Sequence, residues 1–210
     1  VNVFLKDEVL VKSLGAKTKF PKKKEKINVE FVSANPTGPL TMANARGGFY
    51  GDVLSNVLEK TNHNVTREYY INDAGNQVKL LGESILAAEG KIQEKEEYYK
   101  GGYIKDLKGK SAAQAVEVLL KEIQSSLKKA GIKFDVWFSE DKNLRKKGEL
   151  KKVLELMNKK GVLKESAGAL WLDDNVVVKS NLEPTYFLAD LAYHYDKFIK
   201  RKFDAAIDIW

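Results

Sequence analysis

The sequence predicts an α/β fold, in which helices cover a parallel sheet, and three stretches carry this prediction. Residues 28–60 begin with the alternating apolar residues of a strand, break at a turn with two prolines and a glycine, and continue with helical spacing. Residues 64–86 repeat the order of strand, polar turn and helix. The apolar run 205–210 reads as a further buried strand, and nothing follows to cover it, so we expect the chain to be part of a longer protein. Strands that alternate with helices favour a parallel sheet, whose ligands bind beyond the carboxyl ends of the strands.

The composition limits the classes of site that the chain can hold. Hydrophobic residues make up 43% of its 210 residues, which is enough for a core. No apolar run approaches the roughly 20 residues of a membrane helix, and no signal peptide opens the chain, so we expect a cytoplasmic protein with no membrane partner. Cysteine is absent and His63 and His194 are the only histidines, so no protein-bound metal is expected. The net charge of +7 suits a polyanionic partner and a solvated surface about equally.

The first 26 residues read as a short amphipathic helix and a linker. Apolar residues recur at helical spacing within 1–16, and Gly15 is expected to end that helix. Residues 17–26 hold a run of lysines around Pro21, which is typical of a solvated linker.

The next stretch begins with the strand around Val29 and Phe31. A helix with five apolar positions follows: Phe49, Val53, Leu54, Val57 and Leu58. The strand at 64–70 is expected to pair beside the first. It leads into a polar string at 71–77, where Asn and Asp residues most often serve as turn and capping residues, and then into a helix at 78–86.

The second half of the chain is expected to add an insertion before the last strand. Residues 93–110 read as irregular. After them we expect a helix capped by Ser111 and ended by Gly131, a strand at 134–138, a helix at 141–160, a β-hairpin at 169–178 and a helix at 185–200. The helix and hairpin between two parallel strands suggest a small α+β insertion at about 139–180. Tyr186 and Asp190, four residues apart, fall on one side of the last helix.

Three motifs resemble the catalytic domain of arginyl-tRNA synthetase, a class I aminoacyl-tRNA synthetase. They are V-E-F-V-S-A-N-P-T-G-P-L from Val29, R-E-Y-Y-I-N-D-A-G-N-Q at 67–77 and T-Y-F-L-A-D-L-A-Y-H at 185–194, in the family's order. The resemblance implies a Rossmann-like nucleotide-binding domain at 27–210, incomplete at its C-terminus. It implies that 1–26 is the tail of an N-terminal tRNA-contacting domain with its linker. The family's lysine-rich loop and anticodon-binding domain are not found in the 210 residues.

The resemblance also implies roles for individual residues. The residues expected to bind arginine are Glu30, Ser33, Asn35, Tyr186 and Asp190. Those expected to bind ATP are Pro39, Leu40, Thr41, Ala43 and Asn44, and further candidates are Asn72, Asp73, Gln77 and His194. A carboxylate such as Asp190 or Glu30 suits arginine because a planar guanidinium with five donors binds best to a bidentate acceptor.

The chain departs from the family at its His-x-Gly-His signature, which here reads Thr41-Met42-Ala43-Asn44. Thr41 and Asn44 also carry hydrogen-bond donors. We therefore expect them to be the catalytic residues that stabilise phosphate charge, beside the free N–H groups at the start of the helix.

Together these features favour a monomeric ligase that activates arginine with ATP, accompanied by Mg²⁺, and transfers it to tRNA(Arg). We expect the 210 residues alone to be inactive because the lysine-rich loop is missing. The altered signature leaves one alternative open, a synthetase-like paralogue that binds tRNA or arginine without ligase activity. Another nucleotidyltransferase of the same superfold is disfavoured because such enzymes lack the Tyr-x-x-x-Asp helix.

Overall fold

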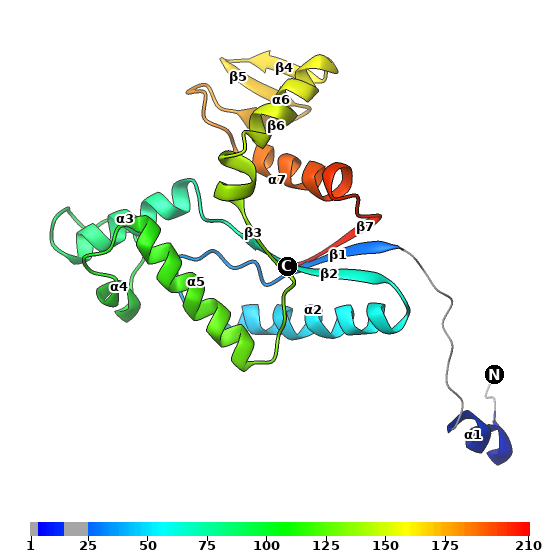
Figure 1. Ribbon diagram of the computed structural model, residues 1–210. Helices are drawn as coiled ribbons and strands as arrows, with labels where there is room; N and C mark the ends of the chain where they lie inside the picture. The colour runs from blue at the N-terminus through cyan, green and yellow to red at the C-terminus, as the bar shows by residue number, and fades with distance from the viewer. Residues whose placement is uncertain (1–3, 15–24) are drawn as a thin grey trace.

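A computed structural model of the chain describes residues 4–14 and 25–210. Its centre is a four-stranded parallel sheet in the order β3-β2-β1-β7. The strands are β1 (Lys26–Phe31), β2 (Asn64–Ile71), β3 (Val136–Ser139) and β7 (Ala205–Ile209). Helices α2 (Met42–Lys60) and α5 (Ala112–Lys129) lie along one face, and α7 (Tyr186–Tyr195) lies on the other (Figure 1). The predicted parallel α/β fold is confirmed, and so is the predicted pairing of the first two strands.

The remaining helices and strands, apart from the N-terminal helix, lie around this sheet (Figure 1). The helices are α1 (Asp7–Leu14), α3 (Asn76–Ala88), α4 (Gly102–Asp106) and α6 (Glu149–Lys159). Two π-helical turns are η1 (Asp141–Arg145) and η2 (Asp196–Lys200), and a small antiparallel sheet holds β4 (Leu163–Ser166), β5 (Ala169–Leu172) and β6 (Asn175–Val178).

Helix α2 packs on the sheet through its small residues. Its buried residues are Gly48, Gly51 and Ser55, and an added Cβ at Gly51 would stand 2.2 Å from the ring of Phe31. Three of the five apolar positions that predicted this helix, Phe49, Val53 and Val57, are exposed by more than half. The helix was predicted correctly, but its buried face is made by residues that allow the closest approach to β1.

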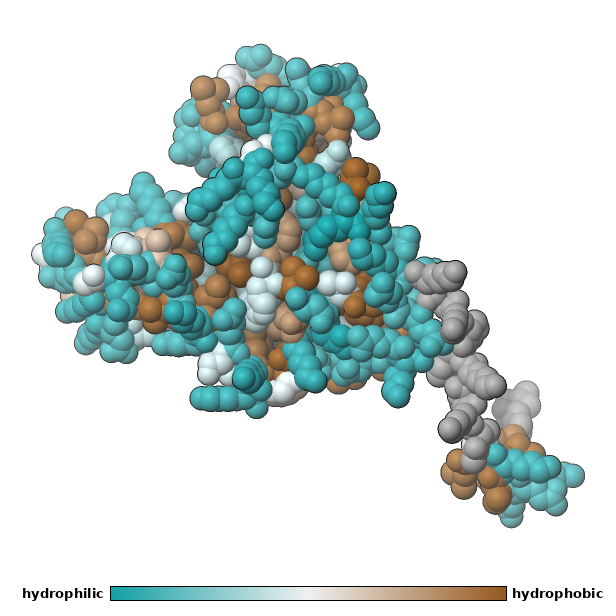
Figure 2. Space-filling view, in the orientation of Figure 1, coloured by the Kyte–Doolittle hydropathy of each residue, from teal (hydrophilic) through white to brown (hydrophobic). Residues whose placement is uncertain are grey.

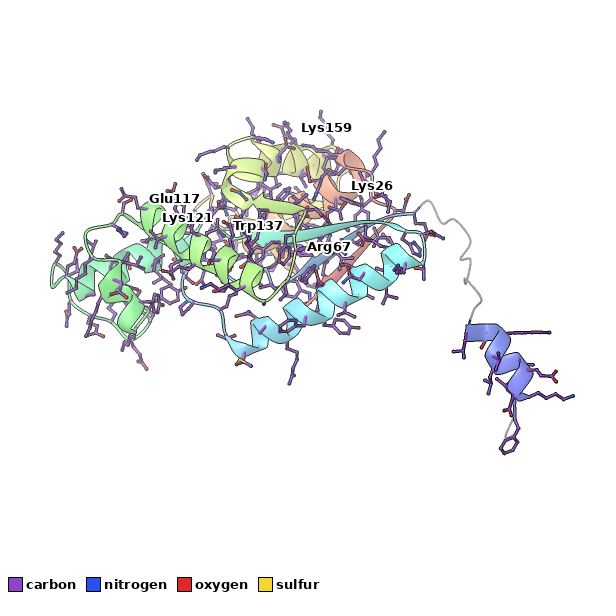
Figure 3. All side chains as sticks on the ribbon, turned by 60° about the horizontal axis from the view of Figure 1, so that its bottom comes forward. Lys26, Arg67, Glu117, Lys121, Trp137 and Lys159 are labelled. Carbon is purple, nitrogen blue, oxygen red and sulfur yellow. The ribbon has the colours of Figure 1, made fainter. Side chains whose placement is uncertain are left out.

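Arg67 ties β2 to the same helix (Figure 3). Its guanidinium donates to Glu59 Oε1 at 2.7 Å and to Asn56 Oδ1 at 2.9 Å, both on α2. This contact holds the helix along the strand, because a planar guanidinium fixes both the distance and the direction of its partners.

Helices α3, α4 and α5 share a core beyond one end of the sheet. Ser111 caps α5 as predicted, and its side chain and that of Gln114 each accept from the other's backbone N–H. The prediction of an irregular segment at 93–110 was wrong over 102–106, because Ile104 and Leu107 are buried against α3 and α5 and stabilise the short helix α4.

The small lobe between β3 and α7 contains the predicted hairpin. It differs from the prediction in an additional strand and in a helix that is split in two. Strands β5 and β6 pair antiparallel, and β4 adds a third strand that was not predicted. The helix expected over 141–160 is split at Gly148, whose φ of 68° no right-handed helix contains. Strand β3 begins at Val136 because Phe134 packs against Phe31 instead. The lobe lies where the insertion at 139–180 was expected, and its independence as a subdomain stays a prediction.

The two ends of the chain differ from their predicted packing. Helix α1 forms as expected, but none of its residues is buried, and Figure 2 shows its apolar side chains open to solvent. Gly15 and most of the linker lie outside the described residues. Strand β7 is half-buried rather than buried, since it lies at the edge of the sheet. In the described part of the chain, no helix is long and apolar enough to cross a membrane.

Candidate active site

A cavity of about 290 Å³ opens beyond the carboxyl ends of β1 and β7. This is the edge where ligands bind in open parallel sheets. Its walls include all five residues expected to bind arginine, together with Asn72 and His194. Residues that lie up to 164 positions apart in the sequence thus meet in one pocket. We call it the acidic pocket, because Glu30, Asp190 and Asp208 all line it.

Helix α7 forms one wall of the acidic pocket. Tyr186, Asp190 and His194 follow one another at four-residue spacing and all line it, so the predicted common face of Tyr186 and Asp190 is confirmed. Thr185 fixes the start of this helix. Its hydroxyl donates to Val176 O on β6 at 2.7 Å and accepts from Leu188 N. The small lobe therefore positions the wall of the pocket.

The turn after β1 forms a second wall and is strained. Val32 and Ser33 have φ values of 67° and 36°, which are unusual for residues other than glycine and rarer still for a β-branched residue. The turn directs Ser33 back toward the strand, where its hydroxyl donates to Glu30 Oε1 at 3.0 Å and accepts from Tyr70 N. Such strain persists only where the surrounding structure holds it, and it is common at ligand sites.

The carboxylates of the acidic pocket differ in how they are compensated. Glu30 already accepts hydrogen bonds on both oxygens, from Ser33 and from Lys197 Nζ at 2.8 Å. Asp190 has no hydrogen bond or ion pair to any other described residue. Burial against the pocket walls raises the pKa of Asp190 above its usual 3.8, His194 opposes this shift, and Glu140, Glu30 and Asp208 add to it. A carboxylate of this kind is stabilised by a cationic ligand.

The polar residues 71–77 after β2 have two different roles. Some of them line the acidic pocket, and others bond to neighbouring parts of the chain. Asn72 is 8% exposed, donates weakly to Tyr186 Oη at 3.4 Å, and leaves its Oδ1 without a partner. Asp73 instead holds the chain after β3, because it accepts from Ser139 Oγ at 2.5 Å and from Asp141 N at 2.9 Å. Gln77 is engaged by the hydroxyl of Tyr99.

The residues expected to bind ATP lie at the start of α2. Thr41 is its N-cap, and the side chains of Thr41 and Asn44 bond to each other: Thr41 Oγ1 donates to Asn44 Oδ1 at 2.8 Å, and Asn44 N donates to Thr41 Oγ1 at 3.4 Å. Neither residue lines the acidic pocket. The loop before the helix, which holds Pro39 and Leu40, is braced by Tyr103, whose hydroxyl donates to Thr37 O at 3.0 Å. Ala43 lines a separate open hollow along the first turns of the helix.

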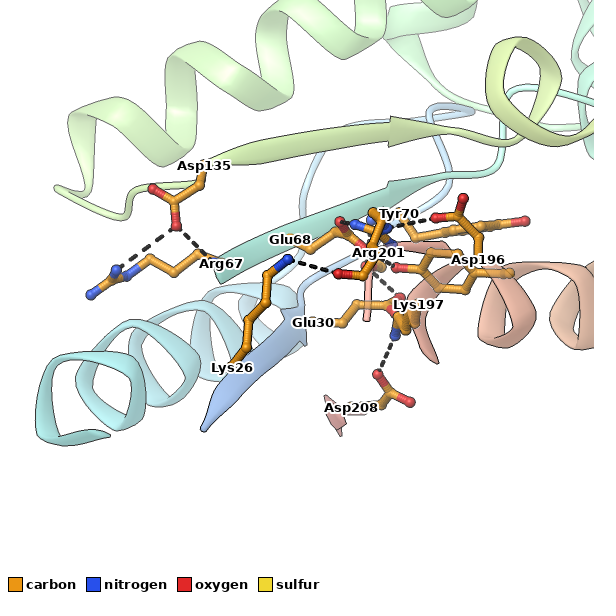
Figure 4. Close-up of polar contacts among 12 residues, drawn as sticks. Lys26, Glu30, Arg67, Glu68, Tyr70, Asp135, Asp196, Lys197, Arg201 and Asp208 are labelled. Carbon is orange, nitrogen blue, oxygen red and sulfur yellow. Dashed lines mark hydrogen bonds and ion pairs between the residues drawn. The ribbon is translucent and has the colours of Figure 1, made fainter. Parts of the chain in front are cut away.

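Sequence reasoning predicted Glu30 as a site residue but missed the row of three acidic side chains to which it belongs (Figure 4). Glu68 on β2, Glu30 on β1 and Asp208 on β7 occupy paired positions across neighbouring strands. A signal was present for Asp208, which is the one charged residue in the otherwise apolar strand β7. The partners of this acidic row come from one side of the last helical segment at four-residue spacing: Tyr193, Lys197 and Arg201.

No group of three His, Cys, Asp or Glu side chains in the described residues is arranged to hold a metal ion.

Comparisons with known proteins identify the family of the chain. The family model described as the catalytic domain of class I tRNA synthetases (R) matches residues 7–110. Arginine–tRNA ligase of Acetivibrio thermocellus is 41% identical over 88% of this chain and 39% of its own length. That of Caldanaerobacter subterraneus subsp. tengcongensis is 39% identical over the whole chain and 44% of its own length.

Solved structures agree as well. A crystal structure of an arginyl-tRNA synthetase from Campylobacter jejuni superposes with a TM-score of 0.79 at 34% identity, over 91% of this chain and 49% of that one. The Thermus thermophilus enzyme, at 21% identity and a TM-score of 0.64, shares the fold over 91% of this chain and 39% of its own. This chain spans about two fifths of the length of the curated relatives. With its three motifs, its parallel sheet and these relatives, the chain belongs to the arginyl-tRNA synthetase family of class I aminoacyl-tRNA synthetases.

Proposed function

We propose that the acidic pocket binds arginine, and that the complete protein activates this arginine with ATP and transfers it to tRNA(Arg), acting as a cytoplasmic monomer. The observation that carries the proposal is the uncompensated carboxylate of Asp190 beside Tyr186 and Asn72 in a pocket with two further acids. A guanidinium offers five donors in one plane, and these three side chains offer acceptors to it.

The charges of the acidic pocket match those of arginine. The free amino acid carries two positive groups, the guanidinium and the α-ammonium. Asp190 reaches the pocket from α7 and Glu30 from β1, so two acids on different elements face the ligand. Ser33 and Asn35, beside Glu30, provide polar groups for the backbone end of the amino acid. A lysine side chain would present a single point charge where the pocket offers several acceptors, which favours arginine.

The start of α2 is suited to the phosphates of ATP. The first turn of the helix contains no acidic residue, and its free N–H groups and positive dipole end attract anions. The Thr41 hydroxyl already donates its hydrogen bond to Asn44 Oδ1, so the amide Nδ2 of Asn44 is the donor left to stand in for a signature histidine. Mg²⁺ would enter with the nucleotide.

In the proposed reaction the arginine carboxylate attacks the α-phosphate of ATP. The bond from that phosphorus to the bridging oxygen breaks, and pyrophosphate leaves. A ribose hydroxyl at the end of tRNA then takes the arginyl group and AMP leaves. Both steps need the reactants held in line and the phosphate charge stabilised, and this chain supplies the arginine pocket and the helix terminus for those tasks.

The test is the substitution Asp190→Asn in the complete protein. Loss of the charge leaves the guanidinium without its anionic partner. Asp190 is exposed in the free protein and the bound arginine would cover it, so we expect the KM for arginine in ATP–pyrophosphate exchange to rise about 100-fold. The KM for ATP should change by less than about twofold, because Asp190 lies in the acidic pocket and not at α2.

Asp174→Asn is the matched control, because Asp174 is exposed in the β5–β6 turn, away from the pocket. An unchanged arginine KM in Asp190→Asn would exclude Asp190 from the site. Arginine binding without any charging of tRNA by the wild-type protein would contradict the ligase function and favour the binding paralogue.

A further inference from the structure

Lys197 lies under the acidic pocket and is completely buried, with 0% of its surface exposed. A buried lysine is rare unless its charge is paired. Its Nζ donates to Glu30 Oε2 and to Asp208 Oδ1, each at 2.8 Å, and the same nitrogen stands 4.2 Å from the centre of the Tyr193 ring. Figure 4 shows the contacts of Lys197 with Glu30 and Asp208.

The two carboxylates that Lys197 binds are neighbours in the sheet. Glu30 on β1 and Asp208 on β7 are paired residues, and both line the acidic pocket. Because each lies one hydrogen bond from the same nitrogen, their charges would repel strongly without it. In Glu30 the two oxygens are held from opposite directions, Oε2 by Lys197 and Oε1 by the hydroxyl of Ser33.

The other two helical partners of the acidic row, Tyr193 and Arg201, both bond to Glu68, which does not line the pocket. Tyr193 also interacts with Glu30 but carries no positive charge. Lys197 is therefore the one described cation that contacts carboxylates of the pocket wall, and it contacts two of them.

We propose that Lys197 is a positioning residue for the amino-acid substrate: it fixes the carboxylate of Glu30 in the pocket wall and cancels one of the two strand-end charges. Lys197, Glu30 and Asp208 together keep one negative charge. This charge faces one end of the ligand, while Asp190 faces the other. Lys197 does not touch the substrate and acts through Glu30. The inference rests on the proposed binding of arginine in this pocket.

The test compares two substitutions in one helical turn of the complete protein. Lys197→Met keeps much of the side-chain volume and removes the charge, so Glu30 loses one anchor and is repelled by Asp208. We expect the Kd for arginine, measured by calorimetry, to rise about tenfold or more, with the Kd for ATP unchanged within about twofold.

Lys200→Met is the matched control. Lys200 pairs with the buried carboxylate of Glu149, outside the pocket, so its loss removes a comparable ion pair from the same segment. We expect the melting temperature to fall in both variants and the arginine Kd to change only in Lys197→Met. An equal loss of arginine affinity in both variants would overturn the proposal.

A double variant covers the case in which Lys197→Met does not fold. Lys197→Met with Asp208→Asn removes one charge of each sign and leaves Glu30 without its anchor at Oε2, so arginine should still bind about fivefold or more weakly than to the wild type. Wild-type affinity in either variant would overturn the proposal, and so would failure of both to fold while Lys200→Met folds. Absence of arginine binding in the wild-type protein would instead refute the proposed function.

Discussion

At the scale of single residues, several polar side chains that were expected to touch substrates also hold the backbone. Asp73 binds the chain after β3, and Thr41 with Asn44 caps α2. Short polar side chains at the end of a strand can bond either to a ligand or to nearby backbone groups, and one sequence does not distinguish these uses. Asp190 differs, because no other described residue bonds to its carboxylate.

The raised pKa of Asp190 predicts how arginine affinity depends on pH. Burial raises this pKa above 3.8 and His194 opposes the shift. Arginine needs the ionised carboxylate, so its affinity should fall as the pH drops through the raised pKa, at a higher pH than an exposed aspartate would give. Calorimetry from pH 7.5 downward checks this, with Asp190→Asn as the reference that lacks the titration.

The raised pKa of Asp190 also affects the stability of the ligand-free protein, and there the ionised carboxylate is unfavourable. A folded-state pKa above the unfolded value means that ionised Asp190 destabilises the ligand-free fold. Asp190→Asn should therefore raise the free energy of unfolding at neutral pH, and this gain should disappear as the pH falls through the folded pKa toward 3.8. A gain that stays constant over the whole range would contradict the raised pKa.

At the scale of elements, the sequence located nearly every helix and strand of the sheet but not their buried faces. The periodic apolar residues of α2 placed the helix correctly, yet Phe49 is 53% exposed while Gly51 lies against Phe31. Apolar periodicity reports helical spacing, whereas the contact surface depends on how closely a particular strand approaches. The short helix α4 was missed because its support comes from α3 and α5, which a local pattern does not contain.

The packing of α2 predicts opposite effects at two glycines of this helix. Gly51→Ala places a methyl group 2.2 Å from Phe31 Cγ, so the helix must move away from β1, and we expect the free energy of unfolding to fall by about 1–3 kcal/mol. Gly47→Ala meets nothing within 4 Å and should raise it by roughly 0.5–1 kcal/mol through helix propensity. Urea unfolding followed by circular dichroism measures both, and equal effects would contradict the packing.

At the scale of the whole molecule, the acidic pocket depends on contacts between distant parts of the chain. The small lobe holds the start of α7, because Val176 O on β6 accepts a hydrogen bond from the Thr185 hydroxyl. The sequence predicted the residues of the pocket walls by resemblance, because they belong to motifs. It did not predict Lys197, because a buried lysine shows its partners only once β1, β7 and η2 are side by side.

The last prediction concerns which step of the reaction the 210 residues can support by themselves. The residues that surround the proposed arginine site lie within these 210 residues, whereas the lysine-rich loop that the resemblance implies does not. We therefore expect the purified 210-residue chain to bind arginine in calorimetry but to show no arginine-dependent ATP–pyrophosphate exchange, since the transition-state charge on the phosphates lacks part of its stabilisation. The complete protein, assayed in parallel, should show both. Exchange above background by the 210 residues alone would show that α2 and its Thr41–Asn44 cap suffice for the chemistry, and loss of arginine binding would show that the pocket needs further parts of the protein to form.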